Sequence, residues 1–355
     1  MTTPLLFQPL DQRGLRLPNR IVVSPMCQYA CKEGLATDWH LVHLGSRAVG
    51  GAGVVLAEAT AVEPRGRISA ADLGLWSDAQ IEPLRRVTAF VEAHGSIPGV
   101  QLAHAGRKGS TRPSWEGGGQ LAPDAGGYAT CAPSARPFRA GEAAPEELDE
   151  AGIAAVVASF VSAAHRARAA GFQIVEVHAA HGYLLHQFLS PLTNGRTDGW
   201  GGSFANRARL TLEVVSAVRA VWPDDLPLWV RLSATDWVEG GWTADETVKL
   251  ASLLGERGVD LVDCSTGGLV PDAVIPVAPG FQVPFAERVR REARVATGAV
   301  GLITEPHQAE QILASGSADV VLLARELLRD PYWPLHAAKA LGVAPTPPRE
   351  YARAF

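Results

Sequence analysis

Two histidines and a tyrosine stand close together in the sequence His-Ala-Ala-His-Gly-Tyr at residues 178–183. Each imidazole is able to donate a hydrogen bond to a carbonyl oxygen and to stabilise an enolate as charge develops. The Tyr183 phenol is a candidate proton donor from the opposite side. A His-x-x-His spacing also suits zinc, but HExxH is absent and no third ligand is evident. We predict that His178, His181 and Tyr183 form a catalytic site, with purely structural histidines as the alternative.

A thiol and a phenol follow the first apolar run, in the sequence Ser-Pro-Met-Cys-Gln-Tyr at residues 24–29. Both Cys27 and Tyr29 are able to face a site at the end of that run. The alternative is that Cys27 is a small buried hydrophobic residue, which is a common role for a free cysteine. The residue types alone leave both interpretations open.

Gln101 and Arg231 lie within apolar runs, where polar side chains need partners. The Gln101 amide donates and accepts, which suits a ring with an alternating polar edge; a glutamine paired with the backbone is the alternative. A buried charge at Arg231 is costly unless it meets an anion. An anionic or partly reduced ring would supply one, and an internal ion pair with Glu58 or Glu176 is the other interpretation.

Short apolar runs that alternate with amphipathic segments would bring these residues together. Eight runs are typical of strands buried on both faces, at residues 21–24, 54–57, 100–102, 174–177, 228–231, 261–264, 299–302 and 320–323. Helical patterns lie between some of them, at residues 146–170, 207–221, 245–257 and 305–314. This alternation predicts an α/β fold, a (β/α)8 TIM barrel, with a doubly wound sheet as the alternative. The absence of GxGxxG after any strand counts against a Rossmann domain.

Barrel enzymes carry their active sites at the carboxyl ends of the strands, where the polar residues above are expected. Residues 301–304 and 323–326 close the seventh and eighth strands, and such loops often bind phosphate. Residues 106–144 are rich in Gly, Pro, Ser and Ala, and we predict a long excursion after the third strand that covers the site. The tail at 343–355 is Pro-rich and is expected to be extended. We treat residues 1–355 as a single domain.

The composition is typical of a soluble enzyme. Hydrophobic residues make up 47% of the chain, and the formal charge of −5 offers no basic surface for nucleic acid or an anionic membrane. The four cysteines form no repeated CxxC, so we predict no metal or iron–sulfur site. No apolar stretch approaches the roughly 18 residues of a membrane helix. The first residues lack the pattern of a signal peptide, and we expect a cytoplasmic protein.

The chain resembles the Old Yellow Enzymes, specifically the bacterial class called thermophilic-like. The resemblance runs nearly end to end, and it depends on the order of several motifs. They are Pro-Asn-Arg-Ile at 18–21 leading to Ser-Pro-Met-Cys, Glu-Ala-Thr-Ala-Val at 58–62, Gln-Leu-Ala-His-Ala-Gly-Arg-Lys at 101–108, the histidine segment through Ser-Pro at 190–191, Arg-Thr-Asp at 196–198, Gly-Gly-Ser at 201–203 and Arg-Glu-Leu-Leu-Arg-Asp-Pro at 325–331. Each motif alone is weak, whereas their order is specific.

The resemblance implies a bound FMN and a role for each matching position. The residues that would surround the isoalloxazine ring are Ser24, Pro25, Met26, Cys27, Ala59, Gln101 and Arg231. Ala324 and Arg325 would occupy the phosphate loop, where the family usually has Gly-Arg. The methyl group of Ala324 is tolerable if φ is negative and costly otherwise. Cys27 would be a class marker that sits near the flavin and adjusts its reactivity.

The resemblance also implies how a substrate binds. His178 and His181 would hold its electron-withdrawing oxygen, Tyr29 would line the pocket, and Lys108 would contribute more weakly. Arg353 would reach into the site of a neighbouring subunit, in a homodimer or homotetramer. The chain departs from the usual pattern at Gly-Trp (199–200), where the family has an acidic–aromatic pair, and at Phe355, where tryptophan is commoner.

The activity implied is that of an ene-reductase. NADPH, with NADH as the alternative donor, would reduce FMN. Hydride would then pass from flavin N5 to Cβ of an α,β-unsaturated carbonyl or nitro compound, with a proton from Tyr183 to Cα. Rival interpretations are a dienoyl-CoA reductase-like barrel, a flavin-free aldolase or isomerase, and a non-catalytic flavin-binding sensor. The chain lacks the cysteine cluster of the first and any evident Schiff-base lysine or metal carboxylate set of the second.

Overall fold

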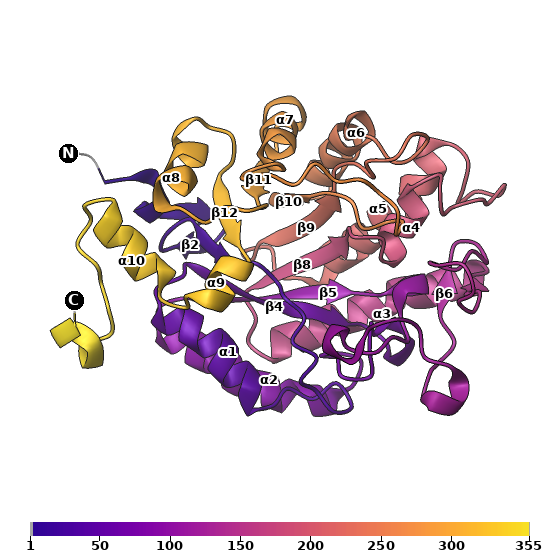
Figure 1. Ribbon diagram of the computed structural model, residues 1–355, viewed down its shortest axis with the longest axis horizontal. Coiled ribbons are helices and arrows are strands. Elements are labelled where there is room, and N and C mark those ends of the chain that lie inside the picture. Colours follow the sequence, from indigo (N-terminus) through magenta and orange to yellow (C-terminus); the bar gives the residue numbers. More distant parts are fainter. Residues whose placement is uncertain (1–2, 355) are drawn as a thin grey trace.

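A closed barrel of eight parallel strands forms the centre of the computed structural model, which describes residues 3–354 (Figure 1). Around the barrel the order is β10-β11-β12-β3-β4-β5-β8-β9. The strands are β3 (Ile21–Val23), β4 (Val54–Ala61), β5 (Ile97–Ala103), β8 (Ile174–Ala179), β9 (Leu228–Ser233), β10 (Leu261–Ser265), β11 (Ala296–Ala299) and β12 (Val320–Leu323). The predicted (β/α)8 barrel is confirmed, and the doubly wound alternative is wrong.

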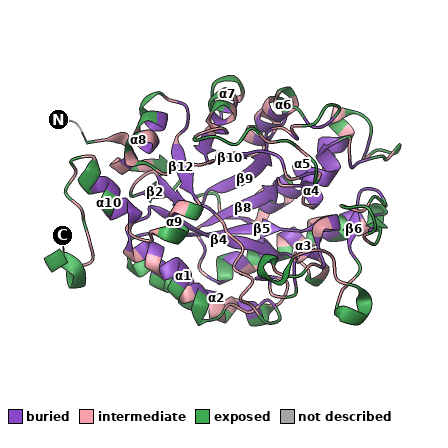
Figure 2. Cartoon of the chain, viewed as in Figure 1, coloured by how far each residue is buried: buried purple, intermediate pink, exposed green. Residues whose placement is uncertain are grey.

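Helices surround the barrel, so the strands are buried on both faces, as Figure 2 shows in purple. The helices are α1 (Asp38–Val49), α2 (Ile81–Ala93), α3 (Glu150–Ala169), α4 (Leu184–Leu189), α5 (Phe204–Val221), α6 (Ala244–Gly255), α7 (Val283–Ala293), α8 (Pro306–Ala314), α9 (Arg325–Arg329) and α10 (Trp333–Ala340). Side-chain caps define several starts: Asp149 accepts from the N–H of Gly152, and Thr243 with Glu246 forms a capping box. No helix among residues 3–354 is long and apolar enough to span a membrane.

The strand register places the predicted site residues side by side. His178 of β8 and Asp263 of β10 both pair with Arg231 of β9. Gln101 of β5 lies between Ala59 of β4 and a residue of β8. Because the strands are parallel, their carboxyl ends meet at one mouth of the barrel. The scattered polar residues of the sequence therefore form one layer.

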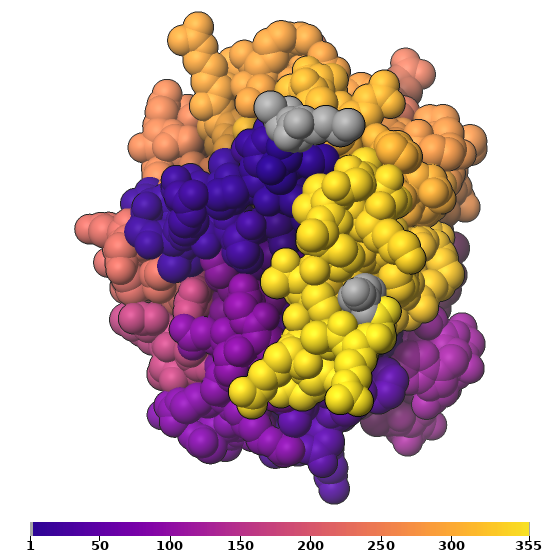
Figure 3. Space-filling view, turned by 90° about the vertical axis from the view of Figure 1, so that its left-hand side faces the viewer, coloured from indigo at the N-terminus to yellow at the C-terminus, as the bar shows by residue number. Residues whose placement is uncertain are grey.

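Two predicted elements differ from those observed. The seventh strand ends at Ala299 instead of continuing to residue 302, because Gly301 (φ 117°) and Leu302 (φ 49°) leave the extended conformation. The tail at 343–348 has no regular structure, but Arg349–Ala354 forms a short 3-10 helix, so the prediction of a wholly extended tail is wrong. Figure 3 shows the N-terminal segment (indigo) and the C-terminal segment (yellow) beside each other on one face.

The predicted excursion after β5 is present and has little regular structure. It contains 3-10 turns at Gly106–Lys108, Ser114–Glu116 and Pro123–Ala125, and the short strand β6 (Cys131–Ala132), which pairs with β7 (Glu146–Glu147). Figure 1 shows this segment in magenta near the β6 label. Single bridges tie Thr111 to Ser69 and to Gln120. The bridge to Ser69 anchors the excursion to the loop that follows β4, and the bridge to Gln120 closes a turn within the excursion.

Candidate active site

A tight turn after β8 presents the two histidines and the tyrosine to one another. The ring of His178 lies 5.1 Å from that of His181 and 5.0 Å from that of Tyr183, both edge-on. His181 and Gly182 have positive φ angles of 57° and 72°. A Cβ at position 182 would lie 2.2 Å from the carbonyl oxygen of Gly268, so only glycine fits this turn. The predicted grouping of the three side chains is observed.

Hydrogen bonds decide which imidazole nitrogens face a ligand. The N–H of Ala180 donates to His178 Nδ1 at 3.3 Å, which places the proton of the neutral ring on Nε2. His181 Nε2 lies 2.7 Å from Ser265 Oγ, which leaves Nδ1 for a ligand. Burial, and then the positive charge of Arg231, lower the pKa of both imidazoles well below its usual value. Both rings are therefore neutral near neutral pH.

Tyr183 is held as a phenol and is flanked by a cation. Burial raises its pKa well above 10.0, and the nearby Cys27, Tyr29 and Asp72 raise it further. Lys108 Nζ lies 5.1 Å from the centre of the Tyr183 ring and donates to the carbonyl oxygens of His181 (2.8 Å) and Gly268 (2.9 Å). Lys108 thus fastens the turn that carries the catalytic candidates.

Cys27 and Tyr29 lie on the same side of the mouth and contact each other. Burial, followed by the charges of Asp72 and Glu58, raises the pKa of the Cys27 thiol, so it stays protonated. Burial also raises the pKa of Tyr29, whose ring meets Trp115 of the excursion at 5.6 Å. Cys27 is only half-buried and close to a polar neighbour, which favours a site over a purely apolar core role.

The polar residues inside the barrel form two pairs. Gln101 Nε2 donates to Glu176 Oε1 at 2.7 Å, so its partner is a carboxylate and not the backbone. Arg231 Nε lies 3.0 Å from Asp263 Oδ2, so the alternative of an internal ion pair is observed, but its partner is Asp263 and not Glu58 or Glu176. Burial and the charge of Asp263 raise the pKa of Glu176. Sequence reasoning missed Asp263, although an acid inside the apolar run at 261–264 was a signal.

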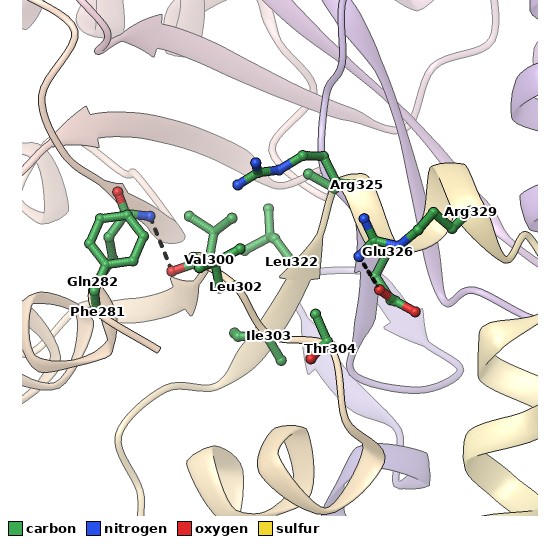
Figure 4. A pocket seen from close by; sticks show the side chains of 12 residues that line it. Phe281, Gln282, Val300, Leu302, Ile303, Thr304, Leu322, Arg325, Glu326 and Arg329 are labelled. Carbon is green, nitrogen blue, oxygen red and sulfur yellow. Dashed lines mark hydrogen bonds and ion pairs between the residues drawn. The ribbon is translucent and has the colours of Figure 1, made fainter. Parts of the chain in front are cut away.

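A cavity of about 150 Å³ lies where the phosphate loop was predicted. It sits between the segment Phe281–Gln282 and the start of α9, as Figure 4 shows, and Arg325 lines it. A Cβ at Gly301 would meet Gln282 Nε2 at 2.9 Å, so glycine keeps this cavity open. Ala324 has φ −107°, and its methyl group carries none of the penalty of a positive φ. The departure from the usual Gly-Arg is therefore tolerated.

Known proteins identify the family. A model of the NADH:flavin oxidoreductase / NADH oxidase family matches residues 5–343. The chain belongs to this family. It is 49% identical over 353 residues to an NADPH dehydrogenase of Geobacillus sp. (strain WCH70), a match that covers 99% of this chain and 98% of that protein.

Solved structures agree with this assignment. Morphinone reductase in complex with tetrahydroNAD is 29% identical, with a TM-score of 0.79 over 98% of this chain and 93% of that one. A 2-naphthoyl-CoA reductase complex is 26% identical, with a TM-score of 0.85; the match covers 96% of this oxidoreductase but only 52% of that chain. The resemblance to Old Yellow Enzymes is confirmed, and the aldolase or isomerase alternative is wrong.

The site collects most, but not all, of the predicted residues. Ser24, directly after β3, and Ala59, in β4, are buried, whereas Pro25 and Met26 are half-buried at the mouth. Arg353 is exposed in the C-terminal 3-10 helix and lines none of the cavities described for this oxidoreductase. Phe355 lies outside the described residues.

A cluster of Glu63, His104 and Cys131 has the residue types of a metal site. However, His104 Nδ1 accepts the N–H of Gly106 at 3.0 Å, so the proton of the ring is on Nε2. That nitrogen lies 2.7 Å from Glu63 Oε1 and has no lone pair left for a cation. The cluster is better explained as a hydrogen-bonded unit that joins β6 to the barrel.

Proposed function

We propose that this oxidoreductase is an FMN-dependent ene-reductase that uses NADPH to reduce activated C=C bonds of α,β-unsaturated carbonyl and nitro compounds. One observation carries the proposal: two neutral imidazoles, each with one ring nitrogen available, stand beside a protonated phenol. The NADPH dehydrogenase name of a 49% identical relative supports the electron donor. The morphinone reductase complex supports a nicotinamide site in this fold.

The residues present fit an FMN. Ser24 Oγ is buried and has no hydrogen-bond partner among the described residues, as expected of an atom that faces a polar ring. Ser24, Pro25, Met26, Cys27, Ala59, Gln101 and Arg231 would hold the ring. Arg325, with the backbone of Ala324 and Gly301, would hold the phosphate in the cavity of Figure 4. When bound, the flavin supplies the hydride for the substrate Cβ, taken from NADPH.

His178 and His181 bind and polarise the substrate oxygen. His178 donates from Nε2, and His181 donates from Nδ1 when the Ser265 hydroxyl donates to His181 Nε2 at 2.7 Å in place of Gln282 Oε1 at 3.3 Å. Because both rings are neutral, they offer hydrogen bonds without the cost of burying two more charges beside Arg231. The bonds strengthen as the oxygen becomes an enolate, so they favour the transition state over the ground state.

Tyr183 holds the proton for Cα. Its raised pKa means that the hydroxyl is fully protonated at any pH at which the enzyme would work. A phenol ordinarily gives up its proton near pH 10, and an enolate carbon is basic enough to take it. The hydrogen goes to Cα, and solvent then reprotonates Tyr183 through the adjacent cavity.

The experiment is a spectrum and a turnover assay on the purified protein. We expect a yellow protein that is bleached by NADPH and recovers its colour when cyclohexenone is added without oxygen. A flavin-binding sensor would be yellow but would not oxidise NADPH at the expense of the enone. A colourless protein that does not take up FMN would refute the proposal.

We also propose a cytoplasmic homo-oligomer in which Arg353 reaches the site of a neighbouring subunit. The support is its exposed position in the C-terminal 3-10 helix, with Tyr351 packed on Tyr332 at 6.1 Å as an anchor. Arg353→Ala should raise the KM for cyclohexenone while the oligomer, measured by light scattering, persists. A monomeric wild-type protein would rule this arrangement out.

A further inference from the structure

A cavity of about 170 Å³ opens beside Tyr183 and Tyr29, beneath the excursion. We call it the vestibule and define it by these two tyrosines, Phe138 and the basic residues Arg107, Lys108, Arg112 and Arg139. Among the described residues, Glu142 is the one acid that lines it. The whole chain has a charge of −5, so this local excess of positive charge runs against the overall balance.

Arg107 is a buried cation with no carboxylate partner. It is 6% exposed, and its guanidinium donates to the carbonyl oxygens of Arg136, Pro137 and Leu269 at 2.8–3.3 Å. Its Nε has no partner, and no carboxylate of residues 3–354 lies at ion-pair distance. Burial, and then the charge of Arg136, lower its pKa to about 10, although the more distant charge of Glu142 partly offsets them. Carbonyl groups satisfy hydrogen bonds, but they do not cancel the charge.

Lys108 adds a second cation beside the first. Among the described residues its ammonium donates to two carbonyl oxygens and meets no carboxylate. Burial, and then the charges of Arg107 and Arg139, lower its pKa to about 8. Phe138 packs between the cations: Lys108 Nζ lies 4.8 Å from its ring centre, and the guanidinium carbons of Arg107 and Arg139 lie at 5.7 and 5.1 Å. Like charges held this close repel unless an anion joins them.

Two exposed arginines extend the positive charge to the opening. Arg139 is partly neutralised by Glu142, with 3.7 Å between Nη1 and Oε1. Arg112 is exposed and makes no ion pair with any residue in the described part of the chain. A buried guanidinium and a half-buried ammonium at the base, with exposed arginines at the rim, are an arrangement that attracts anions and then binds them.

We propose that the vestibule is an oxyanion subsite, which binds a phosphate or carboxylate group of a molecule that reacts at the catalytic site. The geometry supports one continuous ligand, because the Tyr183 ring contacts both His178, at 5.0 Å, and Lys108, at 5.1 Å. A molecule whose reacting end lies at the imidazoles therefore extends past Tyr183 to the cations. The proposal rests on the proposed function. Two molecules of that reaction could supply the anion: the nicotinamide donor, through its phosphates, and a carboxylated enone.

The test uses the holoenzyme and the double variant Arg112→Gln/Arg139→Gln, which changes only exposed side chains. The matched control is the double variant Arg168→Gln/Arg291→Gln, which also changes two exposed arginines. Arg291 is paired with a glutamate, as Arg139 is. We measure KM for NADPH, for cinnamaldehyde and for para-carboxycinnamaldehyde, at low and high salt. The neutral and carboxylated aldehydes share the reacting group and differ only in the anion.

The vestibule variant should raise KM roughly tenfold for the anionic ligand, less so at high salt, with neutral cinnamaldehyde and the control unchanged. A higher KM for NADPH identifies the donor's phosphates as the group bound in the vestibule. A higher KM for the carboxylated aldehyde identifies the carboxylate of the substrate. An active enzyme in which neither KM changes beyond the control overturns the subsite. If the wild type is inactive, calorimetry with adenosine 2′,5′-bisphosphate decides separately: binding weakened in the variant supports the subsite, and no binding overturns it.

Discussion

Replacing Tyr183 by Phe removes one hydroxyl and leaves the ring contacts with His178 and Lys108 in place. The raised pKa of Tyr183 keeps the phenol protonated, so its ionisation state does not limit catalysis. The loss is then the full contribution of a positioned acid, about 10²–10⁴-fold in rate. The vestibule opens beside Tyr183, so water is able to replace the phenol. We expect the lower end, about 100-fold, or roughly 2.7 kcal/mol in the barrier.

The two half-reactions distinguish this role from general damage. NADPH oxidation needs no proton from Tyr183 and should keep its wild-type rate, whereas reduction of cyclohexenone in a single turnover should slow by the full factor. Tyr128→Phe is the matched control, since Tyr128 is a phenol of the excursion whose hydroxyl donates to the carbonyl oxygen of Arg67. Equal enone reduction by Tyr183→Phe and the control would show that the proton comes from another group.

Three further predictions test the site and the fold. His178→Ala removes one donor to the developing enolate and should lower kcat for cyclohexenone by about 100-fold or more; an unchanged kcat with a higher KM would mean that His178 only binds substrate. His178 and His43 have lowered pKa values, to about 3 for His43, because burial disfavours their charged forms. As pH falls below the unfolded value near 6.5, the unfolded chain takes up protons that the folded chain does not, so each costs up to about 1.4 kcal/mol of stability per pH unit. The raised pKa values of Glu176, Asp72 and Asp263 act in the opposite direction over this range, so the loss is measured as a difference between wild type and His43→Gln in urea unfolding from about pH 7 to 5; the same pH dependence in both contradicts it. Ala324→Gly should change the free energy of unfolding by less than about 1 kcal/mol, because the freedom that glycine adds to the unfolded chain is opposed by the release of a backbone at φ −107° and ψ −96°, outside the α and β regions; a loss well above about 1 kcal/mol would mean that the methyl group itself stabilises the loop.

The strands were predictable because parallel barrel strands are apolar on both faces. The eighth predicted run coincides with β12, and the others overlap their strands. The seventh was displaced because Val300 and Leu302 continue the apolar pattern while the backbone at Gly301 turns away. The helices α1, α2 and α7 were not predicted. Apolar residues nevertheless recur along one side of each, as Leu84, Val87 and Val91 do in α2, so the local spacing did carry the signal for these helices.

The chemistry of the site was predictable where residue types are unusual, as for the histidines and Tyr183. Which side chains pair with each other was not predictable, because pairing depends on the register between strands that are far apart in the sequence. Arg231 meets Asp263, from the next strand, instead of Glu58 or Glu176. Arg107 gave no signal in the sequence, because its isolation from carboxylates is visible only once the excursion is folded over it.

The same cations account for both the neutral imidazoles and the affinity for anions. Arg231 and Lys108 each lower the pKa of His178 and His181, so positive charge around the site keeps these rings as neutral donors. The protein compensates only part of that charge, since Arg231 is paired with Asp263 whereas Lys108 donates to carbonyl oxygens. A negatively charged ligand completes the balance, and so does an enolate as it forms. Substituting either cation by a neutral residue should therefore weaken transition-state stabilisation even though neither touches the reacting carbon.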